Sequence, residues 1–300
     1  MKSTLYALSL SVCVAGSASA VTRTWTGSSN TLYQVEANWS GNDVPDSNDN
    51  GVLEGGGTGE TLLTGGINPG NAQALQVRKG HVLTIDNAGG TFNVVNNINM
   101  GQGVSGDDST INLMAGTLNI GGLSMSGNAT GGTSFFTVSG GHLTTGVLNA
   151  GVQHAATFSI IGDTASVTVG AGALNISSNA VFSFTPGATG IDAIDTTGNL
   201  SLSPGAALTI DGSAYTSGPG TLTLFTYGSR ADATEFTENI SGFTDLLVDV
   251  VYSNNAIELV MAPVGGGNIP PTADAQSITM FPGVSTNITL TGSDFEESPL

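Results

Sequence analysis

Basic side chains are nearly absent from this 300-residue chain, and charged residues of any kind are few. Lys and Arg number 5 against 23 Asp and Glu, the formal net charge is −18, and only 9% of the residues are charged. Nucleic acids bind through clustered Lys and Arg side chains, so a nucleic-acid partner is excluded. The same scarcity argues against anionic membrane surfaces and polyuronates, whereas the negative charge keeps copies of the chain apart in solution.

Cysteine is also almost absent, since Cys13 is the only one. It lies in residues 1–20, which have the form of a secretory signal peptide: Lys2 gives a positive start, an apolar core follows, and the final ASA forms a cleavage site. We expect the mature chain to begin at Val21 and to contain no disulfide. A lipoprotein attached through Cys13 is the alternative, but the preceding Val12 suits it poorly. The sequence therefore predicts an exported protein of bacterial type.

Long apolar runs and strong helix formers are missing as well. No stretch after the signal peptide approaches the ~18 apolar residues of a membrane span, so we expect no membrane span in this chain. Glu, Lys and Arg are scarce, whereas Gly occurs 44 times and Val, Ile and Thr are frequent. This composition favours short strands joined by tight turns. The predicted fold class is all-β.

Short apolar bursts recur along the chain with a period of about 25 residues. In most bursts, one apolar residue precedes and one apolar residue follows a single polar residue. The bursts form three staggered series, and successive bursts of one series are 22 to 26 residues apart. The bursts of the first series begin at Phe92, Leu118, Leu143 and Val167. Those of the second series begin at Ile98, Leu123, Leu148 and Leu174, and those of the third at Ile111, Phe136, Phe158 and Phe182.

This repeat predicts a parallel β-solenoid over residues 61–215, with three strands and about 25 residues per turn. Alternation along each strand directs its apolar side chains inward. Stacked turns pair every strand with its copies above and below. Glycines at the corners permit the tight bends. A β-sandwich with accidental regularity is the alternative.

Both ends of a solenoid need a cap. We assign residues 21–60 to an N-terminal cap, because the only two tryptophans, Trp25 and Trp39, lie there and suit the closing of the first turn. An exposed sugar-stacking platform is the alternative role for these two rings. Residues 216–263, in which apolar runs lengthen and glycine thins, are expected to form hairpin-like cap strands at the other end.

The W-x-G…NW opening, the glycine-punctuated rungs and the ending TLTLFTYGS…FTDLLVDVVYSNNAIELV resemble bacterial exported β-helix proteins with autotransporter-associated β-strand repeats. Those proteins belong to the wider group with a pectate-lyase-like helical core. The resemblance covers residues 21–262 and implies a structural or adhesive role at the cell surface or outside the cell. It implies no chemistry by itself.

The C-terminal part has a different composition. Residues 264–271 form a Gly/Pro linker, and residues 272–300 resemble the start of a cadherin-like or immunoglobulin-like β-sandwich module, which we expect to be truncated. The resemblance is carried by PPTADAQ and by TGSDFEESPL, where the family has an acidic turn. It implies a calcium site at Asp294, Glu296 and Glu297, although Glu is less usual there. Calcium is the only cofactor that the sequence suggests.

Other metal-ligating and catalytic motifs are incomplete. Residues 46–51 (DSNDNG) match the first half of a calcium loop, but the acid expected at its twelfth position is replaced by Gly57, so a turn is favoured. The histidines lack metal-ligand spacing and are expected to be satisfied or surface imidazoles; they are His81, His142 and His154.

We therefore expect no catalytic residues, with a polysaccharide hydrolase or lyase as the alternative. Its acids would be Asp192 and Asp195, and its cations Arg78 and Lys79 beside His81. The preferred prediction is an exported structural or adhesive protein whose partner is a surface or matrix polysaccharide or a protein. A non-catalytic carbohydrate-binding protein that uses Trp25 and Trp39 is a further alternative.

Overall fold

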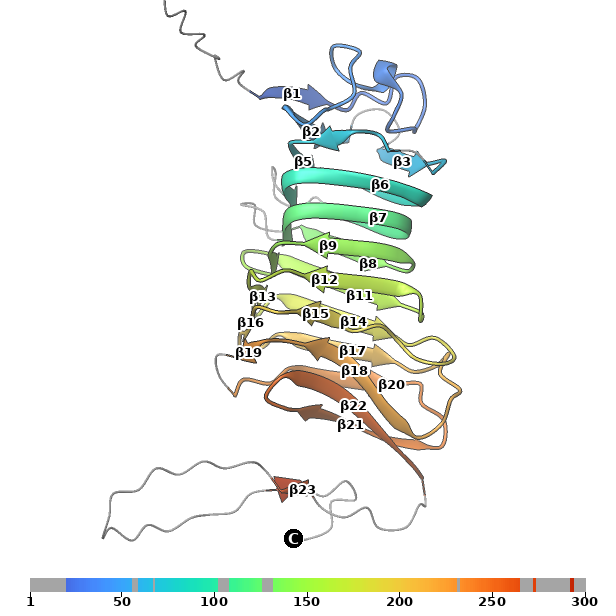
Figure 1. Ribbon diagram of the computed structural model, residues 1–300, viewed down its shortest axis with the longest axis vertical. Helices are drawn as coiled ribbons and strands as arrows, with labels where there is room; N and C mark the ends of the chain where they lie inside the picture. The colour runs from blue at the N-terminus through green and yellow to red at the C-terminus, as the bar shows by residue number, and fades with distance from the viewer. Residues whose placement is uncertain are drawn as a thin grey trace, which may run out of the picture.

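The computed structural model describes residues 20–55, 59–66, 68–101, 108–125, 132–230 and 233–264, together with one short strand pair near the C-terminus. This part of the chain is a parallel β-solenoid of about 7 turns (Figure 1), which confirms the predicted fold class. The regular structure outside the strands is one 3-10 turn, η1 (Glu36–Asn38). No described helix is long and apolar enough to span a bilayer.

The strands stack into three faces that run along the rod. The first face contains β3 (Glu60–Thr64), the start of β6 (Val82–Met100), the start of β7 (Ser109–Met125), β8 (Thr133–Val138), β11 (Ala155–Ile161), β14 (Ala180–Thr185), β17 (Ala207–Asp211) and β20 (Thr237–Ser241). The second contains β4 (Asn71–Ala72), the middle of β6 and β7, β9 (Gly141–Thr145), β12 (Ala165–Val169), β15 (Ile194–Thr196) and β18 (Gly220–Thr226). The third contains β1 (Val21–Thr24), β2 (Asp49–Leu53), β5 (Ala74–Val77), the ends of β6 and β7, β10 (Leu148–Ala150), β13 (Leu174–Ile176), β16 (Asn199–Leu202) and β19 (Ser229–Arg230).

The observed register confirms all three apolar series predicted from the sequence. The first series lies on the second face, where Leu118 pairs with Phe92 on one side and with Leu143 on the other. The second series lies on the third face, and the third series lies on the first face. Equivalent residues of successive turns are therefore neighbours on adjacent strands, which is why each series has a period close to 25 residues.

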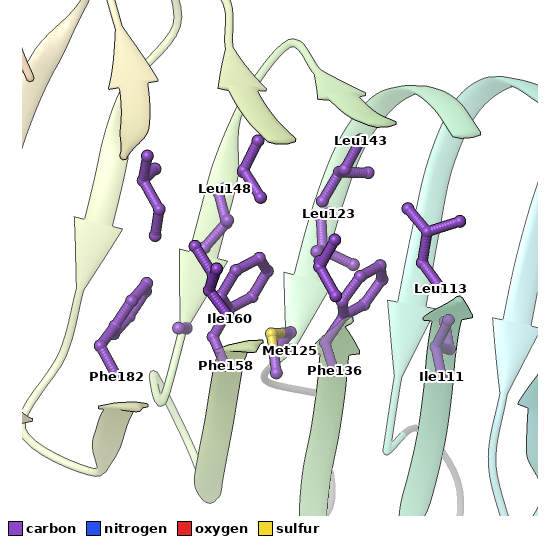
Figure 2. Close-up of a cluster of buried hydrophobic side chains, with 14 of the residues drawn as sticks. Ile111, Leu113, Leu123, Met125, Phe136, Leu143, Leu148, Phe158, Ile160 and Phe182 are labelled. Atoms are coloured by element: carbon purple, nitrogen blue, oxygen red, sulfur yellow. The ribbon is translucent and has the colours of Figure 1, made fainter. Parts of the chain in front are cut away.

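The inward-facing side chains form a continuous core along the axis of the rod. Figure 2 shows Phe136, Phe158 and Phe182 of successive turns in a row along the rod. The ring centroids of Phe136 and Phe158 are 5.4 Å apart with an interplanar angle of 8°, and those of Phe158 and Phe182 are 5.5 Å apart. Strands spaced ~4.8 Å apart place the same position of each turn in van der Waals contact. A ladder of similar residues thus packs without gaps.

One corner, between the second and third faces, is built from stacked glycines. A Cβ atom on Gly146 would overlap the carbonyl oxygen of Gly121 in the turn before. The same overlap would arise between Gly172 and Gly146 and between Gly198 and Gly172. The backbone of each of these turns lies directly on the previous one, so the positions of Gly146, Gly172 and Gly198 tolerate only glycine.

The parallel pairing extends on both sides of the predicted solenoid range of 61–215. At the N-terminal end, β1 and β2 stack on β5. At the C-terminal end, β18 and β20 continue the parallel stacking on β15 and β17. The direction then reverses, because β22 (Ala256–Pro263) pairs antiparallel with both β18 and β21 (Leu246–Tyr252). These antiparallel strands agree with the hairpin-like closing cap expected there.

Beyond residue 264, the structure describes two short strands, β23 (Thr272–Ala273) and β24 (Gly292–Ser293), which pair antiparallel. Residues 265–271 of the predicted linker and most of the predicted module over residues 272–300 lie outside the described part of the chain.

Candidate functional site

Trp25 and Trp39 lie inside the N-terminal cap. Each is 1% exposed, and their ring centroids are 5.2 Å apart in an edge-to-face arrangement. Trp39 Nε1 donates a hydrogen bond to the carbonyl oxygen of Tyr33 at 2.7 Å. A ring that stacks on a sugar must expose one face, and neither ring does. This geometry agrees with the capping interpretation and not with the sugar-stacking platform.

The candidate calcium ligands Asp294, Glu296 and Glu297 lie outside the described residues. At the second candidate, Asp46 Oδ1 accepts a hydrogen bond from the backbone N–H of Asn48 at 2.7 Å, as expected of a turn. Asp49 is 5% exposed and its carboxylate accepts a hydrogen bond from Arg23. The described residues contain no group of three or more His, Cys, Asp or Glu side chains that could hold a metal ion.

The cationic spot around Arg78 is partly neutralised by one acid from the preceding turn, Glu54, which pairs with both cations. Glu54 Oε2 lies 2.9 Å from Arg78 Nε and 2.9 Å from Lys79 Nζ. The Lys79 hydrogen bond, together with the charges of both cations, lowers the pKa of Glu54, and partial burial opposes this effect. His81 points away from the spot into the core. The three residues therefore do not form one surface patch.

Asp192 and Asp195 are both exposed, but different elements hold them. Asp195 projects from β15, where Thr226 Oγ1 donates a hydrogen bond to its Oδ1 at 2.6 Å. Asp192 lies in the segment before β15. The carboxylate of Asp195 is thus part of the outer side-chain column of the second face.

Two of the three histidines are buried among polar neighbours. His81 is 0% exposed, its Nε2 lies 2.8 Å from Thr61 Oγ1, and burial lowers its pKa to about 4. His154 is 5% exposed and its Nε2 lies 3.0 Å from Ser134 Oγ. The partly exposed His142 contacts the hydroxyls of two neighbouring residues through its two ring nitrogens. His142 matches the expectation of a satisfied or surface imidazole, whereas His81 and His154 are satisfied only at Nε2, because the buried Nδ1 atom of each has no hydrogen-bond partner among the described residues.

The outer surface carries columns of neutral polar side chains, which belong to no catalytic motif in the sequence. On the second face, Asn93 Nδ2 donates to Asn71 Oδ1 and Asn119 Nδ2 donates to Asn93 Oδ1, each at 2.9 Å. On the third face, Asn175 Nδ2 donates to Asn149 Oδ1 at 2.6 Å. The sequence did hold a signal for these ladders, because each of these asparagines except Asn71 is the central polar residue of an apolar burst.

A hollow of about 250 Å³ lies beside the ladder of the second face. Its polar lining comes from Asn93, Asn119 and Thr144, and its apolar lining includes Val95 beside Gly121. Val95 is 54% exposed, unlike the inward-facing valines of the core. We call this feature the ladder hollow. Its side chains can exchange hydrogen bonds and make apolar contacts, but they carry no charge.

Comparisons with protein-family models, with curated proteins and with solved structures give no match. The likeness to autotransporter-associated repeats and to cadherin-like modules therefore rests on the sequence pattern alone.

Proposed function

We propose that this chain is an exported structural or adhesive β-solenoid without catalytic activity, located at a bacterial cell surface or outside the cell. The observation that supports the proposal is the outer surface of the rod, where Thr, Ser and Asn side chains stand in register from turn to turn. About 7 turns, stacked ~4.8 Å apart, hold such groups at fixed spacing over roughly 35 Å. Repeated weak contacts along one partner then combine into firm attachment.

Export is supported by the signal-peptide form of residues 1–20, and the bacterial origin by the resemblance to exported proteins with autotransporter-associated repeats. The downstream segment fits a tandem array in which a cadherin-like module follows the rod. Calcium held by Asp294, Glu296 and Glu297 would stiffen that module. The partner is a surface or matrix polysaccharide, or a protein.

The first experiment tests location. The full chain is expressed in a bacterial host, cell fractions are separated, and the N-terminal residue of the product is determined. We expect the product outside the cytoplasm, starting at Val21. A product that keeps residues 1–20 and stays in the cytoplasm would contradict export.

The second experiment tests adhesion against catalysis. The purified protein is incubated with neutral and acidic polysaccharides, with and without calcium, and both protein depletion and newly formed sugar ends are measured. Depletion without new ends supports the adhesive proposal. New sugar ends would overturn it in favour of a polysaccharide hydrolase or lyase, and substitution of Asp192 and Asp195 would follow.

A further inference from the structure

We propose that the ladder hollow binds a neutral polysaccharide chain. The inference rests on the adhesive function proposed above and names the surface and the chemical class of its partner. It starts from three properties of the hollow, which are its uncharged polar lining, its exposed apolar side chain and its place on a repeating column.

The polar lining has hydrogen-bonding capacity left for a ligand. A side-chain amide has two N–H donors and an oxygen with two lone pairs. The ladder uses one donor and one acceptor of Asn93, through its bonds to Asn71 and Asn119. Sugar hydroxyls both donate and accept, so they match amide groups better than a purely accepting or purely donating ligand does.

The apolar lining supplies a surface for the C–H face of a sugar ring. Val95 is 54% exposed and lies at the corner where the next turn contributes only Gly121. The close approach of Gly121 to the carbonyl oxygen of Val95 excludes a side chain at this point. The corner therefore stays open beside the valine. A largely apolar surface with a few polar groups is the usual composition of a ligand site.

Charge selects the class of polysaccharide. The lining residues of the ladder hollow include no acid and no base. A polyanion would be repelled by the net charge of −18 and would find no cation here. A polycation would find no carboxylate in this hollow. A neutral chain has neither disadvantage.

The column also favours a polymer over a single sugar. On the second face, the polar positions that follow Asn119 in register are Thr144 and then Thr168, each one turn further along the rod. An extended chain that lies along the axis can therefore contact successive turns. Each added contact is weak, but the contacts act together.

The test uses binding of the full-length protein to insoluble cellulose, starch granules and agarose, with polygalacturonate and chitosan as charged comparisons. The central variant is Val95→Glu, which introduces a charge and an oversized side chain at the rim of the hollow. Its matched control is Val152→Glu, because Val152 is 53% exposed, carries the same added charge when substituted and does not line the hollow. Thermal unfolding of both variants checks that the fold is kept.

We expect the wild-type protein and Val152→Glu to bind at least one of the neutral polysaccharides equally well. Val95→Glu is expected to bind about tenfold or more weakly, since docking would desolvate an unpaired carboxylate. Equal binding by both variants would overturn the proposed surface while leaving an adhesive role intact. Binding to the charged polymers alone, or to none of the polysaccharides, would also overturn it, and a protein partner would then remain for the adhesive proposal.

Discussion

Acid is expected to destabilise the N-terminal end of the solenoid through His81. The imidazole is 0% exposed, its Nε2 contacts Thr61 Oγ1 at 2.8 Å, and its ring centroid lies 6.2 Å from that of Trp25. Burial lowers the pKa of His81 to about 4. In the unfolded chain the pKa returns to about 6.5. The unfolded state therefore binds a proton over a pH range in which the folded state does not.

The size of the effect follows from these two values. Above about pH 6.5, His81 is neutral in both states and contributes no pH dependence. As the pH falls from 6.5 towards 4, the free energy of unfolding decreases by about 1.4 kcal/mol per pH unit, or roughly 3 kcal/mol in all. Below about pH 4 the folded protein is protonated as well and the loss levels off.

Urea unfolding at pH 7 and at about pH 4.5 measures this loss in the wild-type protein and in His81→Gln. Between the two pH values, the wild type is expected to lose roughly 2.5 kcal/mol more than the variant. Carboxylates titrate in both proteins, so their contribution cancels in the comparison. His142→Gln is the control, since it keeps His81 and with it the histidine contribution. An identical pH dependence in the wild type and His81→Gln would refute this assignment.

Three further substitutions, one of them with a matched control, test the core, the glycine corner and the cap. Phe158→Ala removes the middle ring of the phenylalanine stack and should lower the free energy of unfolding by about 3–5 kcal/mol, measured as a lower urea midpoint with an unchanged slope. Gly146→Ala forces a methyl group onto the carbonyl of the turn before and should cost roughly 1–3 kcal/mol. Gly220→Ala, where a Cβ meets no atom within 4 Å, should cost far less, and equal losses for the two glycines would contradict the steric explanation. Trp39→Phe removes the indole N–H that satisfies the buried Tyr33 carbonyl and should cost about 1–3 kcal/mol, whereas an unchanged midpoint would show that this bond does not stabilise the cap.

The architecture could be predicted because each turn of a solenoid repeats the sequence pattern of the turn before, here with a period of about 25 residues. The pairing of Phe136 with Phe158 and of Leu123 with Leu148 follows directly from the spacing of the bursts. Burial of the apolar positions followed from alternation along each strand. The extent of the stacking did not follow, because β1, β2 and β20 themselves lack the complete burst pattern. Backbone pairing there continues without the sequence signal.

The candidate site could be predicted from the sequence less well than the fold. Whether Trp25 packs inward or stands on the surface depends on the path of residues 25–39, which no period constrains. The pairing of Glu54 with Arg78 spans one turn and was hidden because charges, unlike apolar residues, do not repeat here. The ladder hollow depends on the exposure of a single side chain, Val95, at a corner. The exposure of Val95 depends on which residue the neighbouring turn places beside it, and the sequence around Val95 does not reveal that residue.

The excess of acidic over basic residues affects the strand edges at the C-terminal end of the rod. The register gives β20 one strand partner, β17, and gives β21 one strand partner, β22. Among the described residues, each strand therefore has an outer edge without a strand partner, and an unpaired edge can add a strand from another chain. Exposed Glu238 on β20 and exposed Asp249 on β21 place negative charge along these edges. Since every copy carries the same sign, we expect two such edges to repel each other, which disfavours strand pairing between copies at this end of the solenoid.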